Sequence, residues 1–263
     1  MEAAIKKIQE NFKRGQDYIL MFSGGADSSS ILGVAKNGGI NIKPVWVNNG
    51  FNRATKDEIE QQAKNLGASD LKIVPVKAGS IVCSNPYNRC YFCKSDILNK
   101  IFEPGSIIID GTTKSDSGNY RPGLKALDEF SVKSILAESG IEKYMATEIA
   151  AHFGADLNIA GMESCLATRF NYGMEITEKY VQALREIERF IISETGDYNV
   201  RCRIDDEDHM RIELKYKESY VKFTDEEFRK KIINLSQGIT MFVTLDLMQS
   251  RPNEYDKKIK HGF

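Results

Sequence analysis

Histidine is scarce in this sequence, which has only His152, His209 and His261 among its 263 residues. Chemistry that depends on several imidazoles, such as a histidine-rich metal centre, is therefore disfavoured. An excess of charge of one sign is also lacking, because 36 basic and 37 acidic residues leave a formal net charge of −1. Without a broad basic surface, a nucleic acid is not an expected partner.

Long apolar runs are missing as well. No stretch approaches the roughly 20 apolar residues that a membrane-spanning helix needs. Residues 1–15 have helical spacing and lack the apolar run of a signal peptide. We therefore expect a cytoplasmic protein without a membrane partner. In that compartment, the five cysteines are more often catalytic or metal-binding than disulfide-bonded.

Short apolar, β-branched runs alternate with helical patterns through the first part of the chain, as is typical of buried parallel strands and their connecting helices. We predict strands over residues 18–22, 43–47, 71–76 and 106–109. Helices are predicted over about 28–37, 54–66, 94–102 and 142–153. The alternation predicts an α/β fold with a doubly wound, mostly parallel sheet, on which ligands bind at the carboxyl ends of strands.

The pattern changes after about residue 170. A long amphipathic helix is predicted first, and two strands, a helix and a strand follow it, at roughly 176–194, 198–204, 210–216, 224–236 and 242–247. This order predicts a small α+β domain over 171–263, after a nucleotide-binding domain over 1–170. No internal repeat or Gly/Ser linker marks the boundary between them.

A glycine-rich loop follows the first predicted strand, where residues 23–28 are Ser-Gly-Gly-Ala-Asp-Ser and open a helix near Ser28. Gly24 and Gly25 let the backbone approach an anion, and the helix end presents unpaired N–H groups. A plain glycine turn with a serine helix cap would explain the Gly-Gly pair alone. Six positions between a strand and a helix favour phosphate binding.

These six residues resemble the SGGxDS signature of the PP-loop ATP pyrophosphatases, and the sequence lacks the GxxxxGK[ST] of Walker loops. The resemblance implies that ATP is cleaved between its α and β phosphates. Ser23, Gly24, Gly25 and Ser28 would surround the pyrophosphate. Asp27 would help to hold Mg²⁺, since a hard cation prefers carboxylate oxygens.

The same resemblance assigns further residues to the nucleotide site. Val47 lies in the segment 45–49, where such folds contact adenine through the backbone. Its neighbour Trp46 fits a core position at least as well. Gly111 and Thr112, in an Asp-Gly-Thr motif after the fourth predicted strand, complete the predicted ATP site.

Cys90 and Cys93 form a CxxC just before a predicted helix, and Cys165 precedes Leu-Ala-Thr-Arg. One CxxC fits a zinc site, a redox dithiol, an iron–sulfur cluster or a chance spacing. A four-ligand zinc site is disfavoured, because Cys83 and Cys202 lack a second spaced pair and are interpreted as small buried hydrophobes. Three thiolates on a 4Fe-4S cluster would leave one iron open to carry a hydrosulfide.

A wider resemblance, covering nearly the whole chain, is to the LarE family of pyridinium-3,5-biscarboxylic acid mononucleotide sulfurtransferases. The matching segments are Ser23–Ser28, Asn85–Pro86, Arg89–Lys94, Asp110–Thr112, Tyr120–Gly123, Cys165–Ala167, Arg169, Tyr172–Gly173, Val200–Arg203 and Val243–Leu247. The chain departs from the family pattern at residues 113–116, where Thr-Lys-Ser-Asp replaces Asn-Ala-Asp-Asp, and at Thr168, where serine is frequent. These departures concern substrate contacts more than ATP chemistry.

The resemblance implies that a carboxylate of a small pyridinium mononucleotide is adenylated and converted to a thiocarboxylate for the nickel-pincer cofactor of lactate racemase. In one version of the family, the cysteine matching Cys165 gives up its own sulfur. In another, cysteines matching Cys90, Cys93 and Cys165 bind a 4Fe-4S cluster, and the enzyme is reused. This chain has all three, so we expect the cluster version, with a sulfide or persulfide donor and a homo-oligomeric state in which a hexamer is possible.

Arginines supply candidate anion contacts. Arg201 and Arg203 alternate along a predicted strand, so both point to one face and would form a bidentate phosphate clamp. Two solvated charges would produce the same pattern. Arg169 is a weaker candidate of this kind, and Glu188 would either orient an arginine or form an exposed helical pair.

Two other functions stay open. A tRNA thiolase also joins a PP-loop to three cysteines, but the near-neutral charge and the missing RNA-binding module count against it. A nucleotide- or metal-binding protein without turnover is the second alternative, and the intact Asp27 and Ser28 count against it.

Overall fold

The computed structural model describes residues 1–116, 121–251 and 255–256. They form two compact units, the first from residues 1–77 and 90–164, and the second from 78–89 and the described part of 165–263. Tyr120, from the segment that resembles the LarE family, lies outside the described residues. Nothing in the sequence pattern indicated that 78–89 pack with the second unit.

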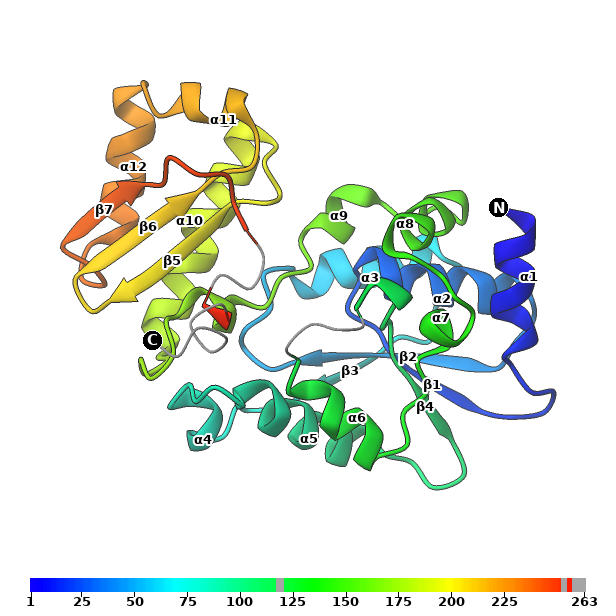
Figure 1. Cartoon of the computed structure of the whole chain (residues 1–263). Coiled ribbons are helices and arrows are strands. Elements are labelled where there is room, and N and C mark those ends of the chain that lie inside the picture. The colour runs from blue at the N-terminus through cyan, green and yellow to red at the C-terminus, as the bar shows by residue number, and fades with distance from the viewer. Residues whose placement is uncertain (117–120, 252–254, 257–263) are drawn as a thin grey trace. The chain divides into compact units, whose positions relative to one another are not determined.

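The first unit is built on a four-stranded parallel sheet with the order β3-β2-β1-β4 (Figure 1). Leu20 of β1 is in register with Pro44 of β2 on one side and Ile109 of β4 on the other. The strands are β1 (Tyr18–Met21), β2 (Ile42–Asn48), β3 (Lys72–Pro75) and β4 (Ile107–Ile109). The predicted α/β class and parallel sheet are confirmed, with every strand end within one residue of its predicted position.

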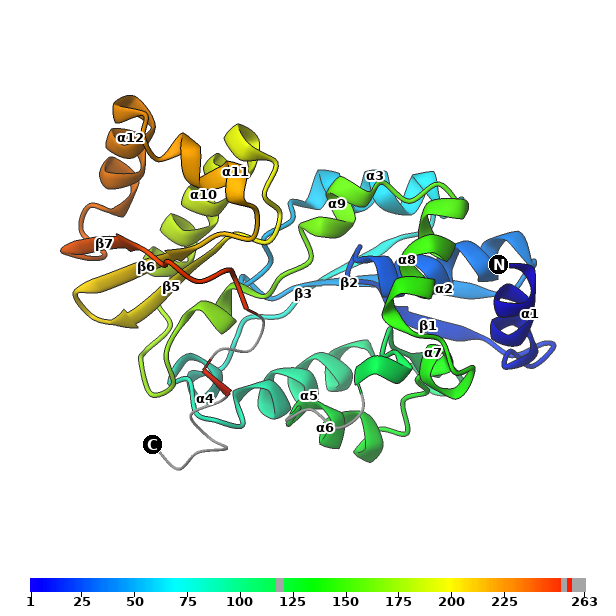
Figure 2. The same cartoon turned by 45° about the horizontal axis from the view of Figure 1, so that its top comes forward.

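Helices cover both faces of this sheet, with α5 and α6 on one face and α2, α3 and α8 on the other (Figure 2). The helices of this part of the chain are α1 (Glu2–Glu10), α2 (Ala26–Asn37), α3 (Lys56–Asn65), α5 (Arg89–Ile101), α6 (Gly123–Glu129), α7 (Ile135–Glu138), α8 (Lys143–His152) and α9 (Leu157–Gly161), with a 3-10 turn η1 (Lys114–Asp116). Thr55 starts α3 with a reciprocal capping box, in which Glu58 bonds back to the Thr55 backbone.

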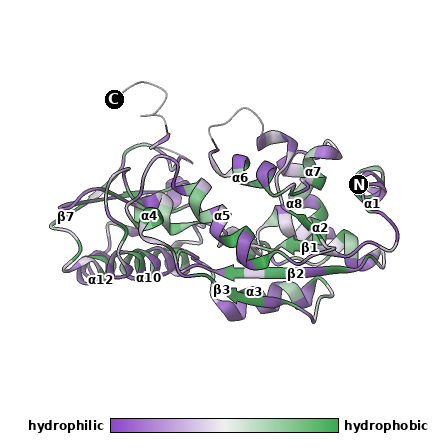
Figure 3. Ribbon diagram, turned by 90° about the horizontal axis from the view of Figure 1, so that it is seen from below, coloured by the Kyte–Doolittle hydropathy of each residue, from purple (hydrophilic) through white to green (hydrophobic). Residues whose placement is uncertain are grey.

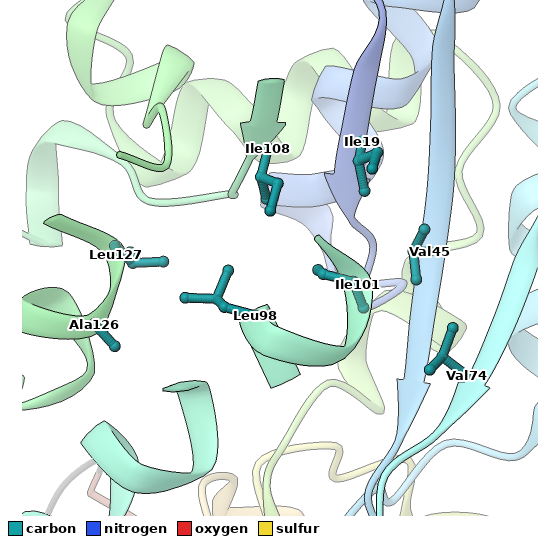
Figure 4. Packing of buried hydrophobic residues seen from close by; sticks show 8 residues of the cluster. All are labelled: Ile19, Val45, Val74, Leu98, Ile101, Ile108, Ala126 and Leu127. Carbon is teal, nitrogen blue, oxygen red and sulfur yellow. The ribbon is translucent and has the colours of Figure 1, made fainter. Parts of the chain in front are cut away.

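One hydrophobic cluster of the first unit lies where α5 and α6 meet the sheet (Figure 4). Leu98 and Ile101 of α5 pack with Ile19, Val45 and Ile108 from three strands, and all five are almost fully buried. Each such side chain contributes about 1.5–3 kcal/mol through burial. Figure 3 shows hydrophobic stretches along β1 and β2, with hydrophilic positions between them in β2. This packing fixes the strand ends from which the candidate site is built.

The second unit has a three-stranded sheet in the order β5-β6-β7. Strands β5 and β6 are antiparallel, whereas β6 and β7 are parallel. Helices α10, α11 and α12 lie on one face of the sheet (Figure 2). The elements are α4 (Ser80–Cys83), η2 (Leu166–Arg169), α10 (Glu178–Thr195), β5 (Arg201–Asp206), β6 (His209–Glu213), α11 (Lys217–Lys222), α12 (Glu226–Ser236) and β7 (Phe242–Leu245). The predicted helix, two strands, helix and strand are confirmed, and α11 is an addition.

Residues 78–89 join this unit through the backbone and side chain of Asn85. The Asn85 carbonyl accepts a hydrogen bond from the Gly173 N–H at 3.0 Å, and its side-chain amide donates to the Asn171 carbonyl at 2.8 Å. Asn85 itself is fully buried, with a φ of 56°. In the described ranges, no helix combines the length and the apolar character needed to cross a bilayer.

Candidate functional site

The glycine-rich loop lies at the carboxyl end of β1, between β2 and β4, where the strand order of the sheet changes direction. Open α/β sheets bind ligands at this point. Helix α2 begins at Ala26 with Gly25 as its N-cap, two residues before the predicted start. Gly24 has a φ of 82°, and a Cβ there would lie 2.4 Å from Ile59 Cδ1. Both facts favour glycine at this position.

Two serines shape the loop. The Ser23 N–H donates to Ser28 Oγ at 3.3 Å, and the two hydroxyl oxygens lie 3.1 Å apart. The Ser28 hydroxyl also donates to the Gly25 carbonyl at 3.2 Å. The loop is therefore folded back over the first turn of α2, whose positive dipole end favours an anion.

Asp27 lies in the first turn of α2 and is 7% exposed. Its Oδ2 accepts a hydrogen bond from Lys143 Nζ at 2.9 Å, whereas its Oδ1 is buried and has no hydrogen-bond partner among the described residues. Burial raises the pKa of Asp27, and this effect exceeds the opposing effect of Lys143. An orphaned buried carboxylate oxygen fits a ligand for a hard cation such as Mg²⁺.

Glu163 brings a second carboxylate to the loop. The Ser23 hydroxyl donates to Glu163 Oε1 at 2.8 Å, and Oε2 lies only 1.7 Å from the point that a Cβ on Gly25 would occupy. Desolvation of the carboxyl group raises the pKa of Glu163, and the negative charge of Asp27 raises it further. The residue as a whole nevertheless keeps exposed surface.

Sequence reasoning missed both Lys143 and Glu163. Lys143 is the first residue of α8, and Glu163 follows the end of α9, so neither belongs to a recognisable motif. Only the packing of α8 and α9 on α2 brings them to the loop. Nothing in the local sequence around a distant charged residue indicates that it will lie next to this loop.

The ends of β2 and β4 complete this edge of the sheet. Val47 is half-buried near the end of β2, and Trp46 is a core residue at 3% exposure, which confirms the core interpretation. Gly111 follows β4, and a Cβ there would lie 3.1 Å from the Ser28 amide nitrogen. The absence of a side chain lets this segment approach α2. Thr112 donates its hydroxyl to Asp110 Oδ2 at 2.5 Å, which fixes the turn after β4.

Cys90 and Cys93 lie within the first two turns of α5, so the prediction that the CxxC precedes the helix was wrong. Their spacing places both on one side of the helix. Cys90 is exposed, and half-buried Cys93 accepts a hydrogen bond at Sγ from Asn49 Nδ2 at 3.5 Å. Lys94 Nζ lies 3.9 Å from Asp110 Oδ2. The CxxC turn is thereby connected to the ends of β2 and β4.

Cys165 is exposed and belongs to the second unit, so the three cysteines are divided between the units. Its carbonyl accepts a hydrogen bond from Thr168 Oγ1 at 2.7 Å, and that hydroxyl accepts one from Arg169 at 2.9 Å. The Thr168 hydroxyl thus links the Cys165 backbone to the Arg169 guanidinium. In the ranges described by the structure, no three His, Cys, Asp or Glu side chains gather at metal-binding distance. The cluster stays a prediction.

The interpretation of the other two cysteines as small hydrophobes agrees with their surroundings. Cys202 lies in β5 with no exposed surface. Cys83 is half-buried at the end of α4.

Arg169 and Glu188 form a bidentate ion pair inside the second unit. The Nε–Oε1 distance is 2.6 Å and the Nη2–Oε2 distance is 2.9 Å, with side-chain exposures of 1% and 0%. Burial alone would lower the pKa of Arg169, but the Glu188 carboxylate raises it above its ordinary value. Glu188 therefore orients an arginine, and the alternative of an exposed helical pair was wrong.

Arg203 is also buried, so its interpretation as a solvated charge was wrong. Its guanidinium pairs with Glu213 at 3.3 Å and donates to the Thr168 and Arg251 carbonyls at 2.8 and 2.6 Å. Arg201 is half-buried and donates to the Asn199 carbonyl at 2.6 Å. A phosphate clamp made by both arginines stays a prediction.

Three proteins are similar to this chain in sequence. No protein-family model matches the chain. An uncharacterised protein of Methanocaldococcus jannaschii is 31% identical over 244 residues, which cover 87% of this chain and 92% of the relative. An uncharacterised protein of Synechocystis sp. is 29% identical over 257 residues, 94% of each chain. The pyridinium-3,5-bisthiocarboxylic acid mononucleotide synthase of Lactiplantibacillus plantarum is 28% identical over 222 residues, 81% of this chain and 77% of that protein.

Proposed function

Because the chain belongs to the LarE family, we propose that it is a sulfurtransferase in the biosynthesis of a nickel-pincer nucleotide cofactor. Its substrate would be pyridinium-3,5-biscarboxylic acid mononucleotide, with sulfur supplied as sulfide or persulfide. The proposal extends to a cytoplasmic homo-oligomer without a nucleic-acid or membrane partner. The relative from Lactiplantibacillus plantarum, which is named for the bisthiocarboxylic acid product, supports this substrate class.

The first half of the proposed reaction is adenylation. A substrate carboxylate oxygen attacks the α phosphorus of ATP, the bond to the β-phosphate oxygen breaks, and pyrophosphate leaves. The acyl carbon then carries AMP, a far better leaving group than oxide. The observation that supports this half most directly is the loop at the switch point of the sheet, beside the buried Oδ1 of Asp27, which has no hydrogen-bond partner among the described residues.

Residues of the first unit have separate roles in the adenylation step. Ser23, Gly24, Gly25 and Ser28 bind the phosphates through the loop and the helix end. Asp27 would hold Mg²⁺, which neutralises charge on the leaving pyrophosphate when bound. Val47, Gly111 and Thr112 lie at the ends of the neighbouring strands and would contact the rest of the nucleotide.

The second half is sulfur transfer. A sulfur nucleophile attacks the acyl carbon, the bond to the AMP oxygen breaks, and a thiocarboxylate and AMP are released. Cys90, Cys93 and Cys165 would hold a 4Fe-4S cluster, which supplies a bound sulfide when present. The exposed Cys165 also fits the alternative, in which its own sulfur is donated once. Arg169, Arg201 and Arg203 would bind substrate phosphate, with Glu188 fixing Arg169.

Adenylation is tested by pyrophosphate release from ATP in the presence and absence of the pyridinium mononucleotide. Substrate-dependent release by the wild type, lost in Asp27→Asn, is the expected result. Release stimulated by bulk tRNA in place of the mononucleotide would favour the thiolase alternative. No release with either acceptor would contradict an adenylating enzyme.

The sulfur source is tested by iron and sulfide analysis of anaerobically purified protein. We expect about four irons per chain, lost in Cys90→Ala, Cys93→Ala and Cys165→Ala. Cys83→Ala is the matched control, because Cys83 is half-buried and has no proposed role. A single turnover without iron, accompanied by loss of the Cys165 sulfur in mass spectrometry, would replace the cluster with single-use donation.

A further inference from the structure

The carboxylate of Glu163 fills the space that the phosphate loop leaves open. Glycine at position 25 clears room above the loop, and Glu163 Oε2 lies within 1.7 Å of the point where a side chain would begin there. Glu163 Oε1 accepts a hydrogen bond from the Ser23 hydroxyl at 2.8 Å. Ser23 and Gly25 are two of the residues that bind pyrophosphate in the proposed function.

We propose that Glu163 is an internal competitor for the phosphate ligand, whose carboxylate occupies the anion position of the free loop and must withdraw before phosphate binds. The inference rests on the proposed function, because it assumes that the loop binds phosphate. Two anions cannot share this space, since they would overlap and would repel each other at a few ångströms.

The charges around the loop explain why a carboxylate is held there. The helix α2 begins at Ala26, and its positive end attracts an anion. The cation Lys143, paired with Asp27 at 2.9 Å, interacts electrostatically with Glu163 too. Glu163 therefore satisfies, in the free protein, the same groups that a phosphate would satisfy in the complex.

The position of Glu163 also allows it to leave. The residue keeps exposed surface, whereas the preceding Met162 is buried at 5% exposure and anchors the backbone. Rotation of one side chain into solvent would open the loop without displacing a helix. Asp27 lies close enough to repel Glu163. That repulsion opposes retention of the carboxylate and favours its exchange for a ligand.

The competition sets the affinity of the site. Any phosphate ligand must displace a carboxylate, so a multiply charged pyrophosphate has an advantage over inorganic phosphate. Glu163→Gln keeps the size of the side chain and an oxygen that can accept the Ser23 hydrogen bond, but removes the charge. Glu163→Ala removes both charge and volume, so the two variants separate the electrostatic from the steric contribution.

Calorimetric titration with inorganic pyrophosphate, without and then with Mg²⁺, tests the inference on the full-length protein. We expect Glu163→Gln to bind pyrophosphate about tenfold more tightly than the wild type, and Glu163→Ala at least as tightly, which corresponds to about 1.4 kcal/mol per tenfold change. Glu148→Gln is the control, because Glu148 is an exposed residue of α8 and its loss changes the net charge equally. That variant should bind like the wild type.

The outcomes separate this inference from the proposed function. Equal or weaker binding by Glu163→Gln, with a wild type that binds, would overturn the competitor role alone. Weaker binding only with Mg²⁺ would overturn it in favour of Glu163 as a metal ligand. If neither the wild type nor any variant binds pyrophosphate or ATP, the phosphate-binding function fails and the inference fails with it. If Glu163→Gln and Glu148→Gln bound pyrophosphate more tightly by the same factor, net charge alone would explain the effect. That result would also overturn the competitor role of Glu163.

Discussion

Acidic side chains in the two units have opposite surroundings. At the glycine-rich loop of the first unit, Asp27 and Glu163 both interact with Lys143, and burial raises the pKa of both carboxyl groups. In the second unit, Glu188 and Glu213 each meet a buried guanidinium. The first arrangement leaves negative charge incompletely matched where a ligand is proposed to bind, whereas the second matches charge inside the protein.

Asp205 shows the second arrangement most clearly. It pairs with Arg211 at 2.8 Å and accepts a hydrogen bond from Tyr255 at 2.7 Å. Burial alone would raise its pKa, but these two hydrogen bonds outweigh burial and lower it. Arg211 also contacts Glu213 at 2.7 Å and Asp246 at 2.5 Å. Matched charges of this kind stabilise the packing of strands. Carboxylates at a loop that are poorly matched can instead bind a cation or interact with a substrate.

Breaking the buried pair in the second unit tests this comparison most severely. Arg169→Ala should lower the free energy of unfolding by about 3–5 kcal/mol, because Glu188 would remain charged without its partner. The double variant Arg169→Met with Glu188→Leu should recover most of this loss. Denaturant unfolding measures both, and Lys230→Ala, which breaks an exposed helical pair, is the control with no expected change. A loss under about 1 kcal/mol in Arg169→Ala would contradict a structural role for the pair.

Neutralising Asp27 in the first unit should affect activity rather than stability, the reverse of what is expected for Arg169→Ala. Asp27→Asn is expected to slow pyrophosphate release by about 100-fold or more, since the amide lacks the charge that would hold a hard cation. Its stability should change little, because Asp27 is poorly matched in the free protein. Asp205→Asn in the second unit should instead lower stability and leave pyrophosphate release unchanged. A large stability loss in Asp27→Asn without an effect on release would reverse this assignment.

The sheet of the first unit was predictable from sequence, because buried parallel strands are continuous apolar runs whose composition is local information. The strand, glycine-rich loop and helix at residues 18–37 were predictable for the same reason, since they are contiguous in the chain. Lys143 and Glu163 were not, because they reach the loop through the packing of α8 and α9. The burial of Arg203 was also hidden, since alternation on a strand does not distinguish the solvent face from the covered face.

Helix caps offer a comparison in which the two units should behave alike. Thr55 caps α3 in the first unit, and Asp225 caps α12 in the second. Replacing either with alanine should lower the free energy of unfolding by about 1 kcal/mol, because one or two helix N–H groups lose their acceptor. Thr55→Ser should retain most of the stability. Denaturant midpoints that differ widely between the two alanine variants would show that the units unfold separately.

The smallest expected effect is the pH dependence of stability around Glu163. Its pKa in the folded protein is raised above the ordinary value of 4.5, so the folded state takes up a proton more readily than the unfolded state. The wild type therefore has its full stability from this group below pH 4.5 and loses it as the pH rises through the folded pKa. Glu163→Gln does not titrate, so its Tm should exceed that of the wild type by about 1–3 °C at pH 8, with no difference at low pH.

Asp205→Asn supplies the opposite sign in the same experiment. The lowered pKa of Asp205 means that its contribution to stability is present above the ordinary value of 3.8 and is lost as the pH falls through the folded pKa. The Tm of this variant should lie below that of the wild type at pH 8, and the gap should close in acid. Tm differences of the same sign in both variants would mean that the two units do not hold their carboxylates differently, because only a raised and a lowered pKa produce opposite slopes.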